Sequence, residues 1–224
     1  MIFPTSVKIG RRGVPKFYML DLPYPPHQFL SRMIRYRKWS MKQALQTVSV
    51  KMENAELELM PSVWTAVFSE WIYWKQQYLE FLPKNAKTVL DVGAACGETA
   101  LLYLLHGVER VICFEPGPDN FRLLERNSSR NSWNVSASQE KFHLGMLSSV
   151  DFDFMKMDCE GCEGELLKAD RLPPCVMEVH QNKVRLEDLM KRFPGLRLAK
   201  RQVGLRFGLS VIGSPLPLDA AHPR

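Results

Sequence analysis

Three acids and one histidine in the second half of the chain have the side chains needed for proton transfer. Asp158 and Glu160 follow one apolar segment, and Glu178 and His180 end the next. A histidine titrates near neutral pH, whereas a carboxylate needs burial or like-charged neighbours to raise its pKa into that range. We therefore predict that His180 or Asp158 is a general base, with Glu160 and Glu178 orienting the histidine or a substrate. A purely structural histidine is the alternative for His180.

The same four residues leave metal chemistry open. Carboxylates and imidazoles are acceptable ligands for Mg²⁺ or another divalent ion, and such an ion would lower the pKa of a bound hydroxyl. Their spacing does not show that the side chains converge on one point. We predict no metal ligand, and a divalent metal is the less favoured alternative.

A glycine-containing turn earlier in the chain has the features of a nucleoside-binding loop. An apolar run from Thr88 to Val92 leads to Gly93 and Gly97, and a helical pattern begins at Thr99. Glycines let a ligand approach the backbone closely, and free N–H groups at a helix start favour an anionic group. The G-x-x-x-G spacing matches neither the dinucleotide motif G-x-G-x-x-G nor the phosphate-binding motif G-x-x-x-x-G-K-[ST]. NAD and ATP are therefore not the first expectation.

A further acid lies where a ribose would bind. The segment from Arg110 to Glu115 has the composition of the next strand, and its terminal acid lies 24 residues after Asp91. At the carboxyl end of the second strand of a parallel α/β unit, a carboxylate can accept hydrogen bonds from both ribose hydroxyls. We predict this role for Glu115, with Asn120 supporting its loop.

These motifs resemble those of class I S-adenosylmethionine-dependent methyltransferases, and most closely the FkbM-like family. The resemblance covers roughly residues 86 to 181, and residues 1 to 60 lie outside it. Its patterns are D-x-G-A-x-x-G-x-[ST], F-E-P-x-P-x-N-F-x-x-L, K-x-D-x-E-G-x-E and E-x-H. They are carried here by Asp91, Gly93, Ala94, Gly97, Thr99, Phe114, Glu115, Pro116, Pro118, Asn120, Phe121, Leu124, Lys156, Asp158, Glu160, Gly161, Glu163, Glu178 and His180.

The resemblance implies S-adenosylmethionine as cofactor, S-adenosylhomocysteine as product, and O-methylation of a hydroxyl-bearing sugar, lipid or natural product. Asp91 is expected to order the glycine turn or to meet the cofactor's ammonium. The backbone at Ala94 and Ala95 and the Thr99 hydroxyl are expected to meet the cofactor's carboxylate. In-line methyl transfer then requires positioning of the acceptor and removal of its proton by a base. The expected cofactor-binding residues are Asp91, Gly93, Ala94, Ala95, Gly97, Thr99, Glu115, Pro116 and Asn120.

Strand and helix patterns alternate through this region. We predict strands at 86–92, 110–115, 134–137, 152–158, 174–180, 196–202 and 205–212, and helices at 97–106, 118–127, 163–168 and 184–193. Such alternation predicts a mainly parallel sheet with helices on both faces, and the last two strands, with no helix between them, an antiparallel addition. The predicted fold is an α/β, Rossmann-like class I methyltransferase fold with a seven-stranded sheet, an antiparallel closing strand and a basic N-terminal extension. The 138–151 stretch is shorter than the family usually has, so no adenine-binding residue is assigned.

The sequence predicts three parts in the chain. We predict a basic arm with an amphipathic helix at 1–60, a catalytic domain at 61–214 and a flexible tail at 215–224. The helix is expected from residue 28 to about residue 46, followed by a short strand at 55–60. A second helix should start at Pro61 and pack on the sheet through an aromatic stripe, because apolar residues recur at helical spacing.

Charge concentrates in the arm. Residues 1–52 carry ten Lys or Arg and one acid, a net charge of +9, whereas the whole chain carries +6. One face of the predicted helix presents Arg32, Arg35, Lys38 and Lys42. This pattern supports an alternative function, an RNA methyltransferase whose extension binds RNA. A second alternative is a non-catalytic binding protein that keeps the fold.

Composition sets the remaining limits. A chain of 224 residues with 46% hydrophobic content can bury one core with an extension. No apolar run is long enough to span a membrane and the first residues lack a secretory pattern, so a cytoplasmic protein is expected. Five cysteines do not resemble a secreted disulfide framework. We interpret Cys159 and Cys162, which form a C-x-x-C, as two small packing residues rather than a zinc or redox pair.

Overall fold

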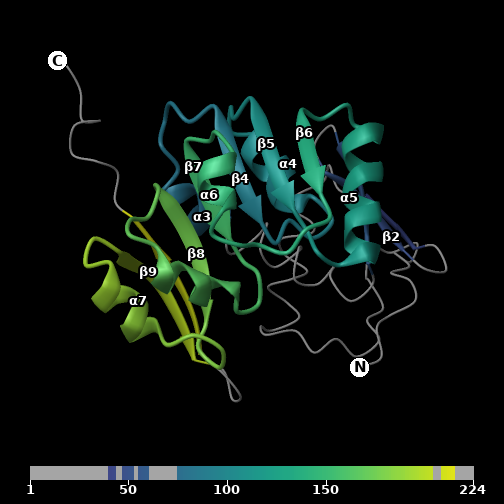
Figure 1. Ribbon diagram of the computed structural model, residues 1–224. Coiled ribbons are helices and arrows are strands. Elements are labelled where there is room, and N and C mark those ends of the chain that lie inside the picture. Colours follow the sequence, from purple (N-terminus) through teal and green to yellow (C-terminus); the bar gives the residue numbers. More distant parts are fainter. Residues whose placement is uncertain (1–39, 44–46, 53–54, 61–74, 204–207, 215–224) are drawn as a thin grey trace.

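The computed structural model describes residues 40–43, 47–52, 55–60, 75–203 and 208–214. Its main element is a seven-stranded sheet with the order β6-β5-β4-β7-β8-β10-β9 (Figure 1). The strands are β4 (Thr88–Val92), β5 (Arg110–Phe114), β6 (Val135–Ser138), β7 (Phe154–Met157), β8 (Cys175–His180), β9 (Arg197–Val203) and β10 (Gly208–Gly213). The five strands β4 to β8 are parallel, and β10 runs antiparallel to both β8 and β9. The predicted strand order along the chain and the antiparallel closing pair are confirmed.

Helices cover both faces of this sheet, as the alternating pattern predicted. On one face, the helices α3 (Lys75–Glu80), α4 (Glu98–Leu104) and α5 (Pro118–Arg130) share a core with Val89 and Val111. On the other face, α6 (Met146–Ser149), the 3₁₀ helix η2 (Cys162–Lys168) and α7 (Leu186–Arg192) share a core with Leu90 and Ile112. Neighbouring strand residues thus point to opposite faces, since side chains alternate along a strand. Within the described residues, no helix has the length and apolar character needed to cross a membrane.

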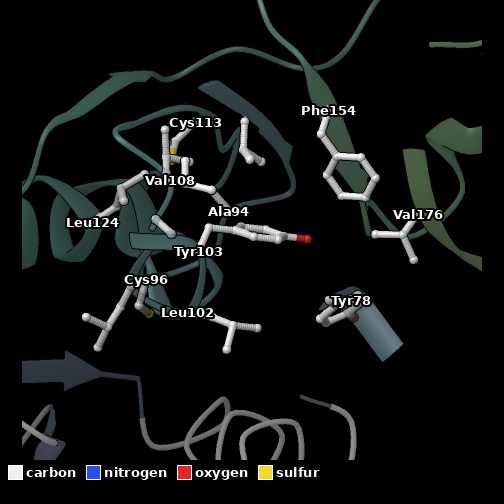
Figure 2. Packing of buried hydrophobic residues seen from close by; sticks show 14 of the residues in the cluster. Tyr78, Ala94, Cys96, Leu102, Tyr103, Val108, Cys113, Leu124, Phe154 and Val176 are labelled. Atoms are coloured by element: carbon white, nitrogen blue, oxygen red, sulfur yellow. The ribbon is translucent and has the colours of Figure 1, made fainter. Parts of the chain in front are cut away.

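Large aromatic side chains fill the first of these cores beneath the glycine turn. Tyr103 of α4 and Phe154 of β7 meet edge to face, with ring centroids 6.3 Å apart. Figure 2 shows them with Tyr78 of α3 nearby in the same cluster. Tyr78 is buried, so α3, the described part of the helix predicted to start at Pro61, packs on the sheet as expected. Residues 61–74 lie outside the described residues.

Residues 40–43, near the end of the helix predicted at 28–46, form a strand instead, and residues 28–39 and 44–46 lie outside the described residues. A second, antiparallel sheet contains β1 (Ser40–Gln43), β2 (Val48–Met52) and β3 (Ala55–Leu59). The backbone of β1 pairs with β2, and this ladder replaces the helical hydrogen bonds that local periodicity favoured. Arg32, Arg35 and Lys38 lie outside the described residues, as does the tail at 215–224, whereas Lys42 lies in β1.

The predicted strand at 55–60 is confirmed as β3, and it packs on the main sheet's own core. Ala55, Leu57 and Leu59 are buried in the cluster that also contains α4 and α5 residues. The intervening Glu58 makes ion pairs with Arg126 and Arg130 of α5. The small sheet is therefore attached to the larger unit through β3 and α5.

Candidate functional site

The parallel strands bring the predicted residues to one edge of the sheet. The glycine turn follows β4, Glu115 follows β5, Asp158 follows β7, and His180 ends β8. These four strands are neighbours in the order β5-β4-β7-β8. Ligands of open α/β sheets bind beyond such carboxyl ends. The structure thus assembles a site from two groups, a turn region around Glu115 and an acidic cluster around His180.

Both glycines of the turn are needed by the protein itself. A Cβ added to Gly93 would lie 1.8 Å from the backbone oxygen of Asp158, and Gly93 has φ +76°. A Cβ on Gly97, at φ +90°, would lie 2.8 Å from Leu124 of α5. Sequence reasoning assigned these glycines to close approach of a ligand. The structure adds that Gly93 also allows the turn to contact the loop after β7.

The turn's N–H groups are used within the protein. Gly93 and Ala94 donate to Phe114 O (2.9 and 3.2 Å), Ala95 to Glu115 Oε2 (2.9 Å), Cys96 to Glu98 Oε2 (3.0 Å) and Gly97 to Ala94 O (2.8 Å). The expected contacts of Ala94 and Ala95 with a ligand carboxylate would therefore compete with these bonds. Burial raises the pKa of Glu98 to about 7, although Lys156 opposes this shift.

Glu115 joins the turn to the loop after β5. Its side chain is buried, with Oε2 accepting from Ala95 N (2.9 Å) and Oε1 from Gly117 N (2.8 Å). Each carboxylate oxygen has two acceptor positions, so each can accept one further hydrogen bond. That capacity fits the two hydroxyls of a ribose. Asn120 accepts a hydrogen bond from the Cys96 thiol at 3.6 Å. Pro116, the residue after Glu115, is exposed.

Asp91 is the centre of a buried polar group under the turn. The Thr99 hydroxyl donates to Asp91 Oδ2, and Lys156 Nζ lies 3.0 Å from Asp91 Oδ1. Lys156 also donates to Gly93 O at 2.8 Å. Burial lowers the pKa of Lys156, but the charges of Asp91 and Asp158 outweigh it and raise the pKa above the ordinary value. This geometry favours the loop-ordering role for Asp91, and its partner Lys156 was missed although it belongs to the K-x-D pattern.

His180 lies among three carboxylates from the loop after β7 and the start of η2. Its Nδ1 lies 2.9 Å from Glu163 Oε1, and its Nε2 lies 3.4 Å from Glu160 Oε2 and 3.8 Å from Asp158 Oδ1. The Glu163 side chain is completely buried, whereas that of Glu160 is 81% exposed. Glu163 was quoted in the sequence pattern but not assigned a role. It fixes one ring nitrogen and leaves Nε2 facing the rim.

These carboxylates change the titration of His180. Burial lowers its pKa, but the hydrogen bond that the ring donates to Glu163 and the negative charges of Asp158 and Glu160 raise it more, to about 9. Desolvation also raises the pKa of Asp158, against the charges of Lys156 and His180. The pKa of His180 is thus shifted above the neutral range that its residue type led us to expect, and the shift favours the imidazolium form beside the carboxylates.

Glu178 of β8 completes the cluster, on the face of the sheet that carries the first core. Its carboxylate accepts a hydrogen bond from the Tyr78 hydroxyl at 2.6 Å, and Tyr78 also faces Lys156, whose Nζ lies 5.8 Å from the ring centroid. Asp158, Glu178 and His180 each offer one donor atom within 4.8 Å of the others. That spacing would accommodate a divalent cation. Tyr78 is a site residue that the aromatic stripe in the sequence did not single out.

A disulfide braces the loop that carries the carboxylates. Cys159 and Cys162 are bonded, with Cα atoms 5.5 Å apart. Their interpretation as two packing residues is wrong: they enclose Glu160 and Gly161, whose φ angles are +56° and +118°. Spacing alone could not distinguish this pair from packing residues, since the backbone conformation decides whether the sulfurs meet. Cys96, Cys113 and Cys175 are buried free thiols.

Known structures share this fold. The N-terminal domain of EvdMO1 with S-adenosylhomocysteine bound matches with a TM-score of 0.51 at 12% identity, over 64% of this chain and 79% of that one. The protein PH0793 of Pyrococcus horikoshii matches with a TM-score of 0.54 at 16% identity, over 76% and 71%. The strand order, the antiparallel closing strand and these matches all indicate the same fold.

The chain has the class I methyltransferase fold. Structural similarity at identities this low shows the fold and assigns no particular reaction to the chain. A curated relative, the uncharacterized protein 158B of Sulfolobus islandicus rod-shaped virus 1, is 25% identical over 138 residues, which are 55% of this chain and 80% of that protein. No protein-family model matches the chain.

Proposed function

We propose that this protein is an S-adenosylmethionine-dependent methyltransferase that methylates a hydroxyl group, with His180 as general base. The observation that carries the proposal is the juxtaposition, on one edge of a methyltransferase sheet, of Glu115 beside the glycine turn and His180 beside Asp158. The FkbM-like assignment is part of this proposal and rests on the sequence patterns.

The turn region fits the cofactor. Glu115 is oriented by two backbone N–H groups and retains one acceptor position on each oxygen, which suits the ribose hydroxyls. Gly93 and Gly97 let the turn pack against Asp158 and Leu124, and this packing holds the turn in place beside Glu115. S-adenosylmethionine would supply a methyl group on a sulfonium, which needs no redox chemistry from the protein.

The acidic cluster fits the acceptor end. Glu163 binds His180 Nδ1, so Nε2 is the atom that takes the proton of an acceptor hydroxyl. A pKa of about 9 means that His180 must first lose a proton. Positive charge brought near the cluster would lower that pKa by electrostatic repulsion. His180 then holds the acceptor proton while Asp158 and Glu160 stabilise the imidazolium that forms.

Charge favours a neutral hydroxyl acceptor over RNA. The rim beside His180 carries Asp158, Glu160 and Glu178, and a phosphate next to the acceptor oxygen would meet these carboxylates. Of the four basic residues predicted to contact RNA, only Lys42 is among the described residues, and it lies in a strand. RNA methylation is therefore the second candidate, carried by the +9 charge of residues 1–52.

The test is transfer of a labelled methyl group from S-adenosylmethionine to two separate pools, a panel of neutral polyols and glycans, and total RNA. The proposal predicts label in the hydroxyl pool that is lost with His180→Asn and kept with His106→Asn, a histidine in the turn after α4 whose ring contacts Leu102 O. Label in RNA that decreases with rising salt would identify RNA as the acceptor instead, because binding through phosphate contacts releases counterions and is therefore salt-dependent. Cofactor binding with no transfer to either pool, and no biological loss with Asp158→Asn, would favour a non-catalytic binding protein.

Metal dependence is checked in the same assay. The base mechanism needs no cation, so chelation with EDTA should leave the transfer rate unchanged. Loss of activity on chelation with recovery on adding Mg²⁺ would instead assign Asp158, Glu178 and His180 to a cation.

A further inference from the structure

The side chain of Asn127 connects three backbone groups from two distant segments. It lies on α5, is completely buried, and its Oδ1 accepts from Glu58 N at 2.8 Å. Its Nδ2 donates to Glu58 O and to Cys96 O, both at 2.8 Å. A side-chain amide has the same donor and acceptor as a peptide unit, so Asn127 pairs with β3 as a neighbouring strand would. Its remaining proton reaches the glycine turn.

Asn131, one helical turn later, provides an internal comparison. Its Oδ1 accepts from Glu56 N and its Nδ2 donates to Glu56 O, both at 2.9 Å. The second Nδ2 proton goes to Asn127 O of its own helix at 2.8 Å. Both asparagines therefore clamp the edge of β3, and of this pair only Asn127 also bonds to the turn.

The end of β3 contacts the turn at the same residue. Cys96 is completely buried in the same hydrophobic cluster as Leu57 and Leu59 of β3, and Met60, which follows β3, packs against that cluster. Cys96 lies between Ala95 and Gly97, the two turn residues with φ of +43° and +90°. The carbonyl that Asn127 holds is thus the one at the point where the turn reverses. Losing its partner would free the segment that carries Ala95 N to Glu115.

We propose that Asn127 is a positioning residue for the cofactor turn and that β3, outside the main sheet, is thereby part of the cofactor site. This inference rests on the proposed function. Docking of β3 and binding of the cofactor then stabilise each other, because linked equilibria are reciprocal.

The variant Asn127→Asp tests this inference against Asn131→Asp. Both substitutions replace the amide donor to β3 with a carboxylate oxygen, but only the first faces Cys96 O. Calorimetric titration of S-adenosylhomocysteine should show affinity reduced roughly tenfold or more in Asn127→Asp and within about twofold of wild type in Asn131→Asp. Lowering the pH should restore affinity in Asn127→Asp relative to wild type, since the protonated carboxyl regains a donor. Equal losses in the two variants, or no pH-dependent recovery, would overturn the inference.

A wild-type measurement covers the case in which Asn127→Asp does not fold. Saturation with S-adenosylhomocysteine should slow hydrogen exchange of the Glu58 amide, which donates to Asn127, more than that of the Glu56 amide, which donates to Asn131. Equal protection of both amides would contradict the inference. Absence of any S-adenosylhomocysteine binding to wild type would instead refute the proposed function.

Discussion

The ammonium group of Lys156 lies 3.0 Å from the carboxylate of Asp91 in the centre of the sheet, with side chains that are 2% and 0% exposed. The two residues are direct partners in the register of β4 and β7. Lys156 also bonds to Gly93 O, so one side chain fixes the start of the glycine turn. The strand that leads to the turn and the strand that leads to Asp158 are joined by this pair.

Removal of one partner should be costly. Lys156→Met leaves the Asp91 carboxylate buried without its cation, and the free energy of unfolding should fall by about 3–5 kcal/mol. Lys87→Met breaks an exposed pair with Glu109, whose side chains are 62% and 63% exposed, and should cost no more than about 1 kcal/mol. Urea unfolding of both variants measures the difference. Equal losses of unfolding free energy in the two variants would show that the buried pair of Lys156 and Asp91 stabilises the fold no more than an exposed pair does.

Gly93 should be far less tolerant than another glycine of similar backbone conformation. Gly93→Ala places a Cβ 1.8 Å from Asp158 O, whereas Gly107, at φ +89°, has no heavy atom within 4 Å of an added Cβ. Gly107→Ala should cost only the left-handed conformation, roughly 1–2 kcal/mol. Gly93→Ala should cost more and also weaken S-adenosylhomocysteine binding, as thermal unfolding and calorimetry would show. Similar losses in both variants would mean that φ alone explains Gly93.

The titration of His180 should depend on Glu163. Glu163→Gln removes a negative charge and weakens the hydrogen bond that raises the pKa to about 9, so the pKa should fall by about one unit or more. Histidine resonances followed by NMR across a pH series measure it directly, with Glu165→Gln as the control, because Glu165 pairs with Lys168 instead. An unchanged His180 pKa in Glu163→Gln would show that Glu163 does not raise the pKa of His180.

The same shift has a consequence for stability. The folded pKa of His180, about 9, lies above the ordinary 6.5, so protonation stabilises the folded state fully below about pH 6.5, and this contribution is lost as the pH rises through 9. The stability difference between wild type and Glu163→Gln should therefore be larger near pH 6 than near pH 10. The opposite trend in urea unfolding would contradict the sign.

Reduction of the disulfide should also lower the pKa of His180. Cys159 and Cys162 enclose Glu160 and immediately precede Glu163, so opening the bond loosens two of the three carboxylates around the ring. A dithiol reductant should shift the His180 resonance towards a pKa of 6.5. The double variant Cys159→Ser/Cys162→Ser should show the shifted value and no response to reductant, because the other three cysteines are already thiols. A pKa that stays at about 9 in both experiments would be contrary evidence.

The main sheet was predictable because its signals are local. The strands β4, β5, β7 and β8 are mainly apolar runs that end in or are followed by a polar or glycine residue, and parallel topology brings those ends together. Asp158, Glu178 and His180 were found for the same reason. The 163–168 helix was predicted as a helix, and the structure gives η2 its 3₁₀ form.

The missed features depend on contacts between distant segments. The periodicity of residues 28–46 favoured a helix, but pairing of Met41 with Val50 makes β1 a strand, a choice that the sequence window does not contain. Lys156 reads as an ordinary strand residue until Asp91 is placed opposite it. Asn127 resembles any polar helix residue until β3 and Cys96 lie against it.

Calorimetric titration of S-adenosylhomocysteine into wild type, Glu115→Ala and Glu140→Ala tests the central claim most directly. Glu140 lies beyond β6, where its carboxylate accepts a hydrogen bond from Ser138, so it serves as an acid outside the proposed site. The account predicts micromolar binding to wild type and Glu140→Ala and at least about tenfold weaker binding to Glu115→Ala. No binding to the folded wild type, or equal binding to all three proteins, would contradict it.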